Sequence, residues 1–165
     1  FILPAWGMSN SVATLVGQNL GANMPDRAEK SVLLTSKYNA VFMGLVTIIF
    51  LFFSNELVSF FIPSSQTAQI DYAVMTLQMV SSAYIFYGIG MVMIQAFNGA
   101  GDTKTPTWIY FIGFWLFQVP LAFCLHKFSN LGTSGVIIAI PIAETLIAIV
   151  SYFIFKRGKW KQIEV

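Results

Sequence analysis

One carboxylate lies within a long apolar run, where keeping its negative charge is costly in free energy. Glu144 is the only charged residue between Lys127 and Lys156. On insertion scales an ionised acid at the bilayer centre costs about 2.5–3.5 kcal/mol. On a helix its face is shared by small and polar residues, namely Ser134, Pro141, Ala148 and Ser151. We therefore expect Glu144 to point into a helix bundle, as a proton or cation relay or, alternatively, as a protonated, hydrogen-bonded structural glutamate.

Other residue types that could do chemistry lack companions. His126 stands alone beside Lys127, without the partners that a metal site or a catalytic triad needs. The GAGDTK segment at 99–104 has the wrong spacing for a phosphate-binding loop. The sequence therefore predicts no enzyme, no metal site and no resident cofactor.

The basic segment KRGKWK at 156–161 raises the possibility of nucleic acid or anionic lipid as a partner. Four cations directly after an apolar run are, however, an ordinary membrane anchor. We expect no nucleic-acid partner.

Composition places the chain in the membrane. Of 165 residues, 56% are hydrophobic and only 10% are charged, and the mean hydropathy is +0.72. The charges lie almost entirely between long apolar runs, which predicts an all-α integral membrane protein. Cys124 is the only cysteine, so no internal disulfide can form. The chain begins at Phe1 inside an apolar stretch, and we expect it to be part of a longer protein.

About twenty apolar residues cross a bilayer as a helix. Counting such runs predicts about five transmembrane helices and a basic cytoplasmic tail at 156–165. The spans are expected at about 1–22, 34–54, 72–98, 105–125 and 132–155.

Two connecting segments carry helical patterns of their own. Residues 23–37 are expected to form a short surface helix, opened by a capping box of Asn23 and Asp26. A short interfacial helix is expected over 56–62.

The uncharged run 72–101 would be roughly 45 Å long as a straight helix, against a hydrocarbon core of about 30 Å. It must tilt, kink or protrude, and Gly88 and Gly90 are the plausible flexing points.

A tight polar hinge, QAFNGAGDTKTP at 95–106, separates the two longest apolar runs. Gly99 and Gly101 let the chain turn, Asp102 and Thr103 can cap the next helix, and Pro106 fits its first turn. The hinge must lie at a membrane surface.

Charge placement predicts an orientation. If the loops alternate sides, eight of the nine Lys and Arg residues fall on one side and only Lys127 on the other. This bias makes the 23–37 segment, the hinge and the C-terminus cytoplasmic. Trp108 and Trp160 suit interfacial anchors.

Two stretches resemble a known family. LVGQNLGANMPDRAEKS, at 15–31, resembles the segment that follows the eighth span of multidrug and toxic compound extrusion (MATE) transporters. The 95–106 hinge resembles the link between that family's tenth and eleventh spans. The resemblance implies the C-terminal portion, about span 8 to span 12, of a twelve-helix, two-lobe transporter whose N-terminal lobe is missing here.

The resemblance also implies a function: a Na⁺- or H⁺-coupled antiporter of the inner or plasma membrane, exporting small organic compounds by alternating access. The implied cavity contacts are Asn10, Gln78, Tyr84 and Tyr87. The implied structural or gating elements are Gly99, Gly101, Asp102 and Pro106. Some members carry a coupling acid in the tenth span, but 72–101 has none, so coupling falls to the missing part or to Glu144.

Two alternatives differ in what they predict. A lipid-linked oligosaccharide flippase of the same superfamily would need a more basic cavity than these spans provide. A membrane subunit that transports nothing would explain Glu144 only as structure.

Overall fold

The computed structural model describes residues 2–63 and 66–162, and its regular elements are all helical, as predicted. Phe1 of the first expected span and residues 163–165 of the tail lie outside the described part. The elements are α1 (Ile2–Gly21), α2 (Pro25–Phe52), α3 (Ser54–Phe61), α4 (Thr67–Ser81), α5 (Tyr84–Gly99), α6 (Lys104–Tyr110), the π-helix η1 (Phe111–Gln118), α7 (Val119–Phe128), α8 (Thr133–Lys156) and the 3₁₀ helix η2 (Lys159–Gln162).

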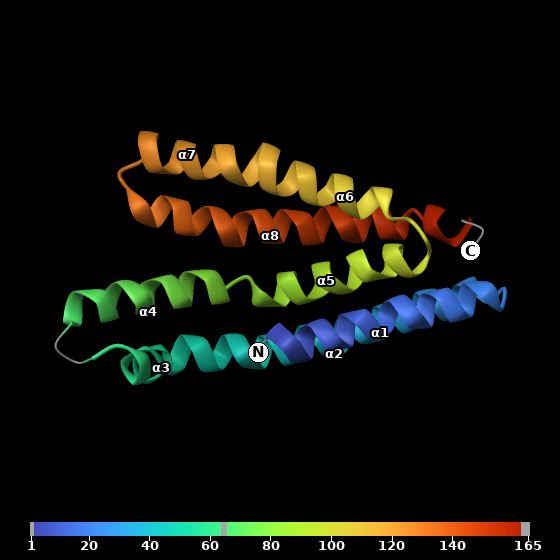
Figure 1. Cartoon of the computed structure of the whole chain (residues 1–165), viewed down its shortest axis with the longest axis horizontal. Coiled ribbons are helices and arrows are strands. Elements are labelled where there is room, and N and C mark those ends of the chain that lie inside the picture. Colours follow the sequence, from blue (N-terminus) through green and yellow to red (C-terminus); the bar gives the residue numbers. More distant parts are fainter. Residues whose placement is uncertain (1, 64–65, 163–165) are drawn as a thin grey trace.

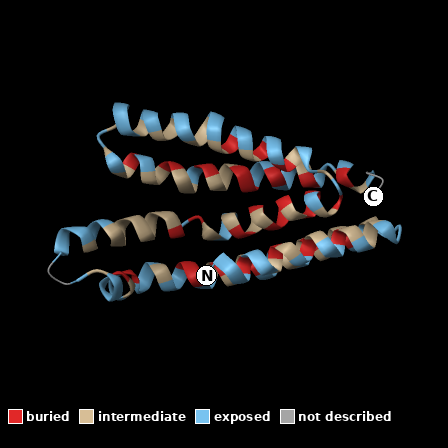
Figure 2. Cartoon of the chain, viewed as in Figure 1, coloured by how far each residue is buried: buried red, intermediate tan, exposed pale blue. Residues whose placement is uncertain are grey.

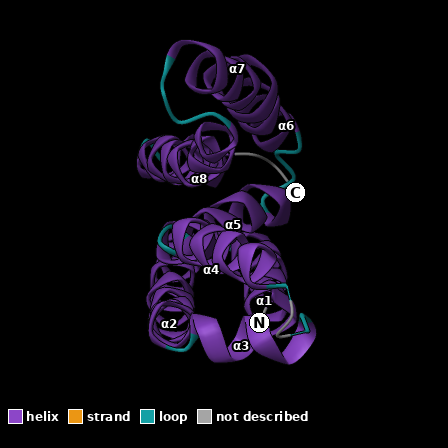
Figure 3. Cartoon of the chain, turned by 90° about the vertical axis from the view of Figure 1, so that its left-hand side faces the viewer, coloured by secondary structure: helices purple, strands orange, loops and turns teal. Residues whose placement is uncertain are grey.

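The long helices run along one common axis (Figure 1). The α1–α2 turn, the α5–α6 hinge and the C-terminus lie at one end, and α3 and the α7–α8 connection lie at the other. Viewed along this axis, α5 and α4 form a middle layer between α8 with its α6–α7 partner and the pair α1 and α2 (Figure 3). The segments expected on one membrane side therefore share one end of the bundle.

Not every expected span has the length and apolarity to cross a membrane alone. Within the described residues, α2, the continuous stretch Lys104–Phe128 and α8 qualify by length and composition. The bent pair α4 and α5 qualifies together as a fourth span. The twenty-residue α1 is not among them, because glycine and polar residues recur along it. The sequence had predicted about five.

The third expected span is interrupted at a different position from the predicted one. Helices α4 and α5 meet at a 48° bend across Ser82 and Ala83, and not at Gly88 or Gly90. The hydroxyl of Thr47 on α2 lies 3.0 Å from the Ser81 carbonyl, so a side chain satisfies a backbone group that the bend frees.

Glycine in α5 serves packing rather than bending. A Cβ at Gly88 would lie 2.9 Å from Met43 Cγ, and one at Gly90 would lie 3.5 Å from the Ala148 backbone. At the end of α5 a Cβ at Gly99 would overlap the backbone of Ala13 on α1. Gly88 and Gly99 therefore let α5 approach α2 and α1 closely, whereas a Cβ at Gly90 would make an ordinary contact with α8.

Helix α5 is the best-buried element, and burial in the bundle concentrates around it (Figure 2). The expected surface helix at 23–37 is not separate, because α2 continues without a break from Pro25 to Phe52. The predicted capping box is absent: Met24 occupies the N-cap position without a side-chain bond, and Asn23 has a positive φ of 57°. The short helix expected at 56–62 is confirmed as α3.

The wide π turn of η1 ends at Gln118, two residues before Pro120. Proline has no N–H to donate, and its ring clashes with the carbonyl four residues earlier in a regular α-helix. The wider turn accommodates this.

After α8 the chain folds back on the bundle. Gly158 turns with a φ of 71°, and Trp160 then stacks on Phe155 with ring centroids 4.9 Å apart. The Trp160 Nε1 donates to the Phe155 carbonyl at 2.9 Å, and only 2% of the residue is exposed. Trp160 is therefore a buried packing residue and not the predicted interfacial anchor.

Candidate functional site

A cavity of about 240 Å³ lies beside the α4–α5 bend and contains the candidate carboxylate. Glu144 of α8 faces Tyr84 and Tyr87 of α5 across it. The other described residues that line it are Ile2, Val80, Ala83, Ile140 and Pro141. The structure thus brings together the predicted coupling candidate and two of the four predicted cavity residues.

The packing of α8 determines where Glu144 points. Ala143, Ile147 and Ala148 are buried against the bundle, whereas Ile142 and Ile149 face outwards. Glu144 lies on the inner side of this boundary and is half-buried. The helix periodicity that predicted an inward-pointing acid describes its position correctly.

The carboxylate of Glu144 has phenol groups near it and no cation. It interacts electrostatically with the hydroxyls of Tyr87 and Tyr110. Among residues 2–63 and 66–162, nothing forms an ion pair or a hydrogen bond with it. Such a group can attract a proton or a small cation into an otherwise apolar cavity. The contribution of Tyr110 was missed, because its position on α6 depends on the fold-back at the hinge.

The tyrosines are held by α5, directly after the bend. The ring of Tyr84 packs edge-on against Phe50 of α2, with centroids 5.9 Å apart. Tyr87 follows one turn later on the same helix and is half-buried. The bend therefore determines the direction in which both phenols enter the cavity.

The other two predicted cavity residues lie elsewhere. Asn10 of α1 accepts a hydrogen bond at 2.8 Å from Gln95 Nε2, and Asn98 donates to Gln95 in turn. Gln78 of α4 donates to Ser54 Oγ at 2.8 Å. Neither Asn10 nor Gln78 lines the Glu144 cavity. Gln95 was not a predicted site residue, although it opens the hinge motif.

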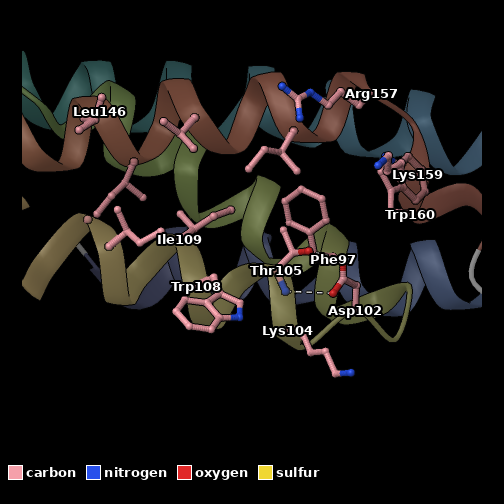
Figure 4. Close-up of a pocket in the computed structure, with 15 residues that line it drawn as sticks. Phe97, Asp102, Lys104, Thr105, Trp108, Ile109, Leu146, Arg157, Lys159 and Trp160 are labelled. Atoms are coloured by element: carbon pink, nitrogen blue, oxygen red, sulfur yellow. Dashed lines mark hydrogen bonds between the residues drawn. The ribbon is translucent and has the colours of Figure 1, made fainter. Parts of the chain in front are cut away.

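The hinge residues form a local structure at the end of α5. The Asp102 carboxylate accepts hydrogen bonds from the Thr105 N–H at 3.0 Å and from the Thr105 hydroxyl (Figure 4). Gly101 has a φ of 79°, which favours glycine, and Pro106 is buried in the first turn of α6. Asp102 thus caps α6, whereas Thr103 makes no capping bond. None of the four predicted hinge residues, Gly99, Gly101, Asp102 and Pro106, lines the Glu144 cavity.

Comparison with known proteins gives one family. Residues 1–124 match the MatE family. A probable multidrug resistance protein YoeA of Bacillus subtilis is 26% identical over 165 residues, which are 99% of this chain and 35% of that protein. An FAD transporter of Shewanella oneidensis is 28% identical, covering 94% of this chain and 34% of its own length.

Solved structures share the fold. The outward-facing conformation of a multidrug resistance MATE family transporter of the MOP superfamily matches with a TM-score of 0.90 at 21% identity. It covers 99% of this chain and 36% of the solved chain. An inward-facing conformation matches with a TM-score of 0.88 over 98% of this chain and 37% of the solved one. The chain spans about a third of the length of the curated relatives that it matches.

Proposed function

The chain belongs to the MatE family, and on that premise we propose that it forms the C-terminal part, about span 8 to span 12, of a cation-coupled antiporter that exports organic, drug-like compounds. Several relatives are named multidrug resistance proteins, including one from Thermotoga maritima that is 27% identical. These names favour a drug transporter over the flippase alternative. This chain covers about a third of the length of these relatives, which is less than one of two similar lobes. The proposed transporter therefore needs the rest of this lobe as well as the N-terminal lobe.

One observation carries the coupling proposal: Glu144 is a membrane-depth carboxylate that faces a cavity without an ion-pair partner among the described residues. In this proposal a proton or Na⁺ binds the carboxylate and removes its negative charge from the apolar surroundings. The ring of Tyr87 lines the same cavity as this carboxylate, so its phenol would contribute to that binding. The backbone at the α4–α5 bend is not helical and lies beside this cavity, as in transporters whose binding sites are formed by broken helices.

The same cavity suggests the class of substrate. Tyr84 and Tyr87 present aromatic rings, and aromatic faces attract organic cations. The carboxylate of Glu144 adds to that preference and disfavours an anionic compound such as the FAD of one relative's name. Asn10 and Gln78 lie outside this cavity. In the proposed transporter they would contact substrate only in a part of the transport pathway that lies between this lobe and the other lobe.

The proposed orientation puts the hinge and the C-terminus in the cytoplasm. Eight of nine basic residues belong to segments assigned to that side, and the α1–α2 turn, the hinge and the C-terminus share one end of the bundle. Transport would proceed by rocking of this lobe against its partner between inward- and outward-facing states. The host bilayer would be the inner or plasma membrane.

The test is efflux of a cationic dye by the complete protein in inside-out vesicles, with Na⁺ and H⁺ gradients applied separately. Glu144→Gln preserves size and removes the charge, and Glu56→Gln is the matched control because Glu56 is exposed on α3. We expect gradient-driven efflux to fall at least tenfold in Glu144→Gln, at unchanged protein level, and to persist in the control.

The outcomes separate the hypotheses. Full efflux in Glu144→Gln would show that coupling depends on acids outside this chain. Absence of efflux even in the unmodified protein, under either gradient, would reject the exporter and leave the flippase or the non-transporting subunit.

A further inference from the structure

A second cavity, larger than the one at Glu144, opens between α6–η1 and α8 near the hinge (Figure 4). Its volume is about 450 Å³. Most of its wall is apolar, formed by Ile109, Ile112, Leu146, Ile147, Val150 and Ile154. Lysine, arginine and tryptophan gather at its hinge end. The transport proposal does not use this crevice.

The inner end of the crevice is closed by a close helix contact. A Cβ at Gly113 of η1 would lie 2.5 Å from Ile147 Cγ1, so the two helices touch at this level. From Lys104 to Gly113 the crevice follows about 14 Å of helix. One leaflet of a hydrocarbon core is about 15 Å deep. The crevice therefore reaches from the membrane surface to about the bilayer midplane, the depth of one acyl chain.

The open end carries cations that form no ion pair within residues 2–63 and 66–162. Arg157 and Lys159 line it, whereas the described ion pairs of the tail use Lys156 and Lys161. Among the described lining residues Asp102 is the one acid, and it keeps its negative charge while it accepts hydrogen bonds from Thr105. The same lining holds three cations, Lys104, Arg157 and Lys159, so the net charge of the described lining is positive.

Two tryptophans and a third cation complete the open end. Trp108 is 62% exposed at the outer rim, and the buried Trp160 forms the opposite wall. Figure 4 shows Lys104 directed away from the apolar wall, so the anchoring role falls to Arg157 and Lys159. An exposed tryptophan such as Trp108 at the level of the headgroups, and an arginine toward a phosphate, are groups that bind a lipid at an interface.

We propose that this crevice binds an anionic glycerophospholipid from the leaflet on the hinge side. Its phosphate lies between Arg157 and Lys159, and one acyl chain follows the apolar wall between α6–η1 and α8 toward Gly113. Such a lipid joins the hinge helix to the last span. The proposal requires only that the chain spans a membrane and is independent of what it transports.

The experiment is native mass spectrometry of the complete protein in detergent. Phosphatidylglycerol and phosphatidylcholine with identical acyl chains are titrated separately, so that only the headgroup differs. The variant Arg157→Gln/Lys159→Gln removes both anchoring cations, and Arg27→Gln/Lys30→Gln is the matched control, with one arginine and one lysine at the same end of the bundle. Each cation near a membrane surface contributes about a fivefold gain in affinity for an anionic lipid.

We expect Arg157→Gln/Lys159→Gln to weaken phosphatidylglycerol binding about 30-fold and to leave phosphatidylcholine unchanged. Val150→Trp fills the crevice and should reduce the binding of both lipids. Inorganic phosphate should not displace phosphatidylglycerol, because the acyl chain supplies part of the affinity.

Three results would overturn the proposal: an equal loss in the Arg27/Lys30 control, undiminished phosphatidylglycerol binding in both crevice variants, or displacement by inorganic phosphate alone.

Discussion

The Nζ atom of Lys161 lies 2.7 Å from Oε2 of Glu29, although the two residues are at opposite ends of the chain. The same ammonium lies 3.2 Å from Asp26, and Lys156 pairs with Glu29 at 3.2 Å. The segment after α8 is thereby tied to the start of α2. The hydrogen bond to Glu29 raises the pKa of Lys161 above its ordinary value of 10.5.

This tie gives the first prediction. Lys161→Gln should lower the free energy of unfolding by about 0.2–1 kcal/mol, the usual range for a solvent-accessible ion pair. Because the pKa of Lys161 is raised on folding, its contribution is fully present below pH 10.5 and is lost as pH rises through the folded-state pKa. Thermal unfolding of the complete protein measures the effect.

A double-mutant cycle with Glu29→Gln isolates the pair. Strictly additive losses would contradict a direct interaction. Lys30→Gln, which removes a cation that makes no described ion pair, is the control and should change the melting temperature least.

The second prediction concerns the crossing of α1 and α5. Gly99→Ala forces a methyl group onto the backbone of Ala13, which cannot rotate away as a side chain can. We expect a loss of about 1–3 kcal/mol, typical of overpacking. Gly21→Ala at the end of α1 is the control, because a Cβ there meets nothing within 4 Å. Equal melting temperatures for the two variants would disprove the close contact.

The third prediction concerns the cap of the hinge. Asp102→Ala removes the acceptor of the Thr105 N–H bond and should cost about 0.5–2 kcal/mol. Asp102→Asn keeps an oxygen acceptor and should retain most of the stability. If a negative charge rather than a cap were required here, both variants would lose the same amount in the melting experiment.

The fourth prediction distinguishes the role of a tyrosine hydroxyl in the Glu144 cavity from the packing role of its ring. Tyr87→Phe keeps the ring and removes the hydroxyl near Glu144. We expect the coupling-ion concentration for half-maximal efflux to rise about twofold to tenfold, in line with the loss of one hydroxyl interaction. Tyr72→Phe, outside the cavity, should leave that concentration unchanged. An unchanged value in Tyr87→Phe would exclude the hydroxyl from ion binding.

Local chemistry predicted the hinge well, although it also predicted a capping box of Asn23 and Asp26 that is absent. The hinge was expected because Gly101, Asp102 and Pro106 each favour one position of a turn and a helix start, and Asp102 indeed caps α6. The inward direction of Glu144 followed from helix periodicity alone. Such features need no knowledge of which helices pack together.

Features that depend on a distant partner were not predictable. Gly88 and Gly90 look like flexing points in sequence, but α5 continues through both, and the lack of a Cβ at Gly88 leaves room for Met43. The real bend is at Ser82 and Ala83, where Thr47 of another helix stabilises the freed carbonyl of Ser81.

The candidate cavity shows the same limit. Tyr84, Tyr87 and Glu144 meet because α5 crosses α8, whereas Asn10 and Gln78 bind neighbours of their own. The spacing of polar residues along one helix identifies the polar face of that helix. It does not identify the helix or side chains that this face contacts. Trp160 illustrates this too: the turn at Gly158 directs an expected interfacial residue into a stack on Phe155.

The bend in the third span has a consequence for biosynthesis. Helix α4 has fifteen residues and α5 has sixteen, about 22 and 24 Å, and neither alone spans a hydrocarbon core of about 30 Å. The two halves must therefore enter the bilayer together as one insertion unit. Because synthesis proceeds from the N-terminus, α2 leaves the ribosome before the α4–α5 bend does. Thr47, the hydrogen-bond partner of the Ser81 carbonyl, is therefore already present when the bend enters the lipid.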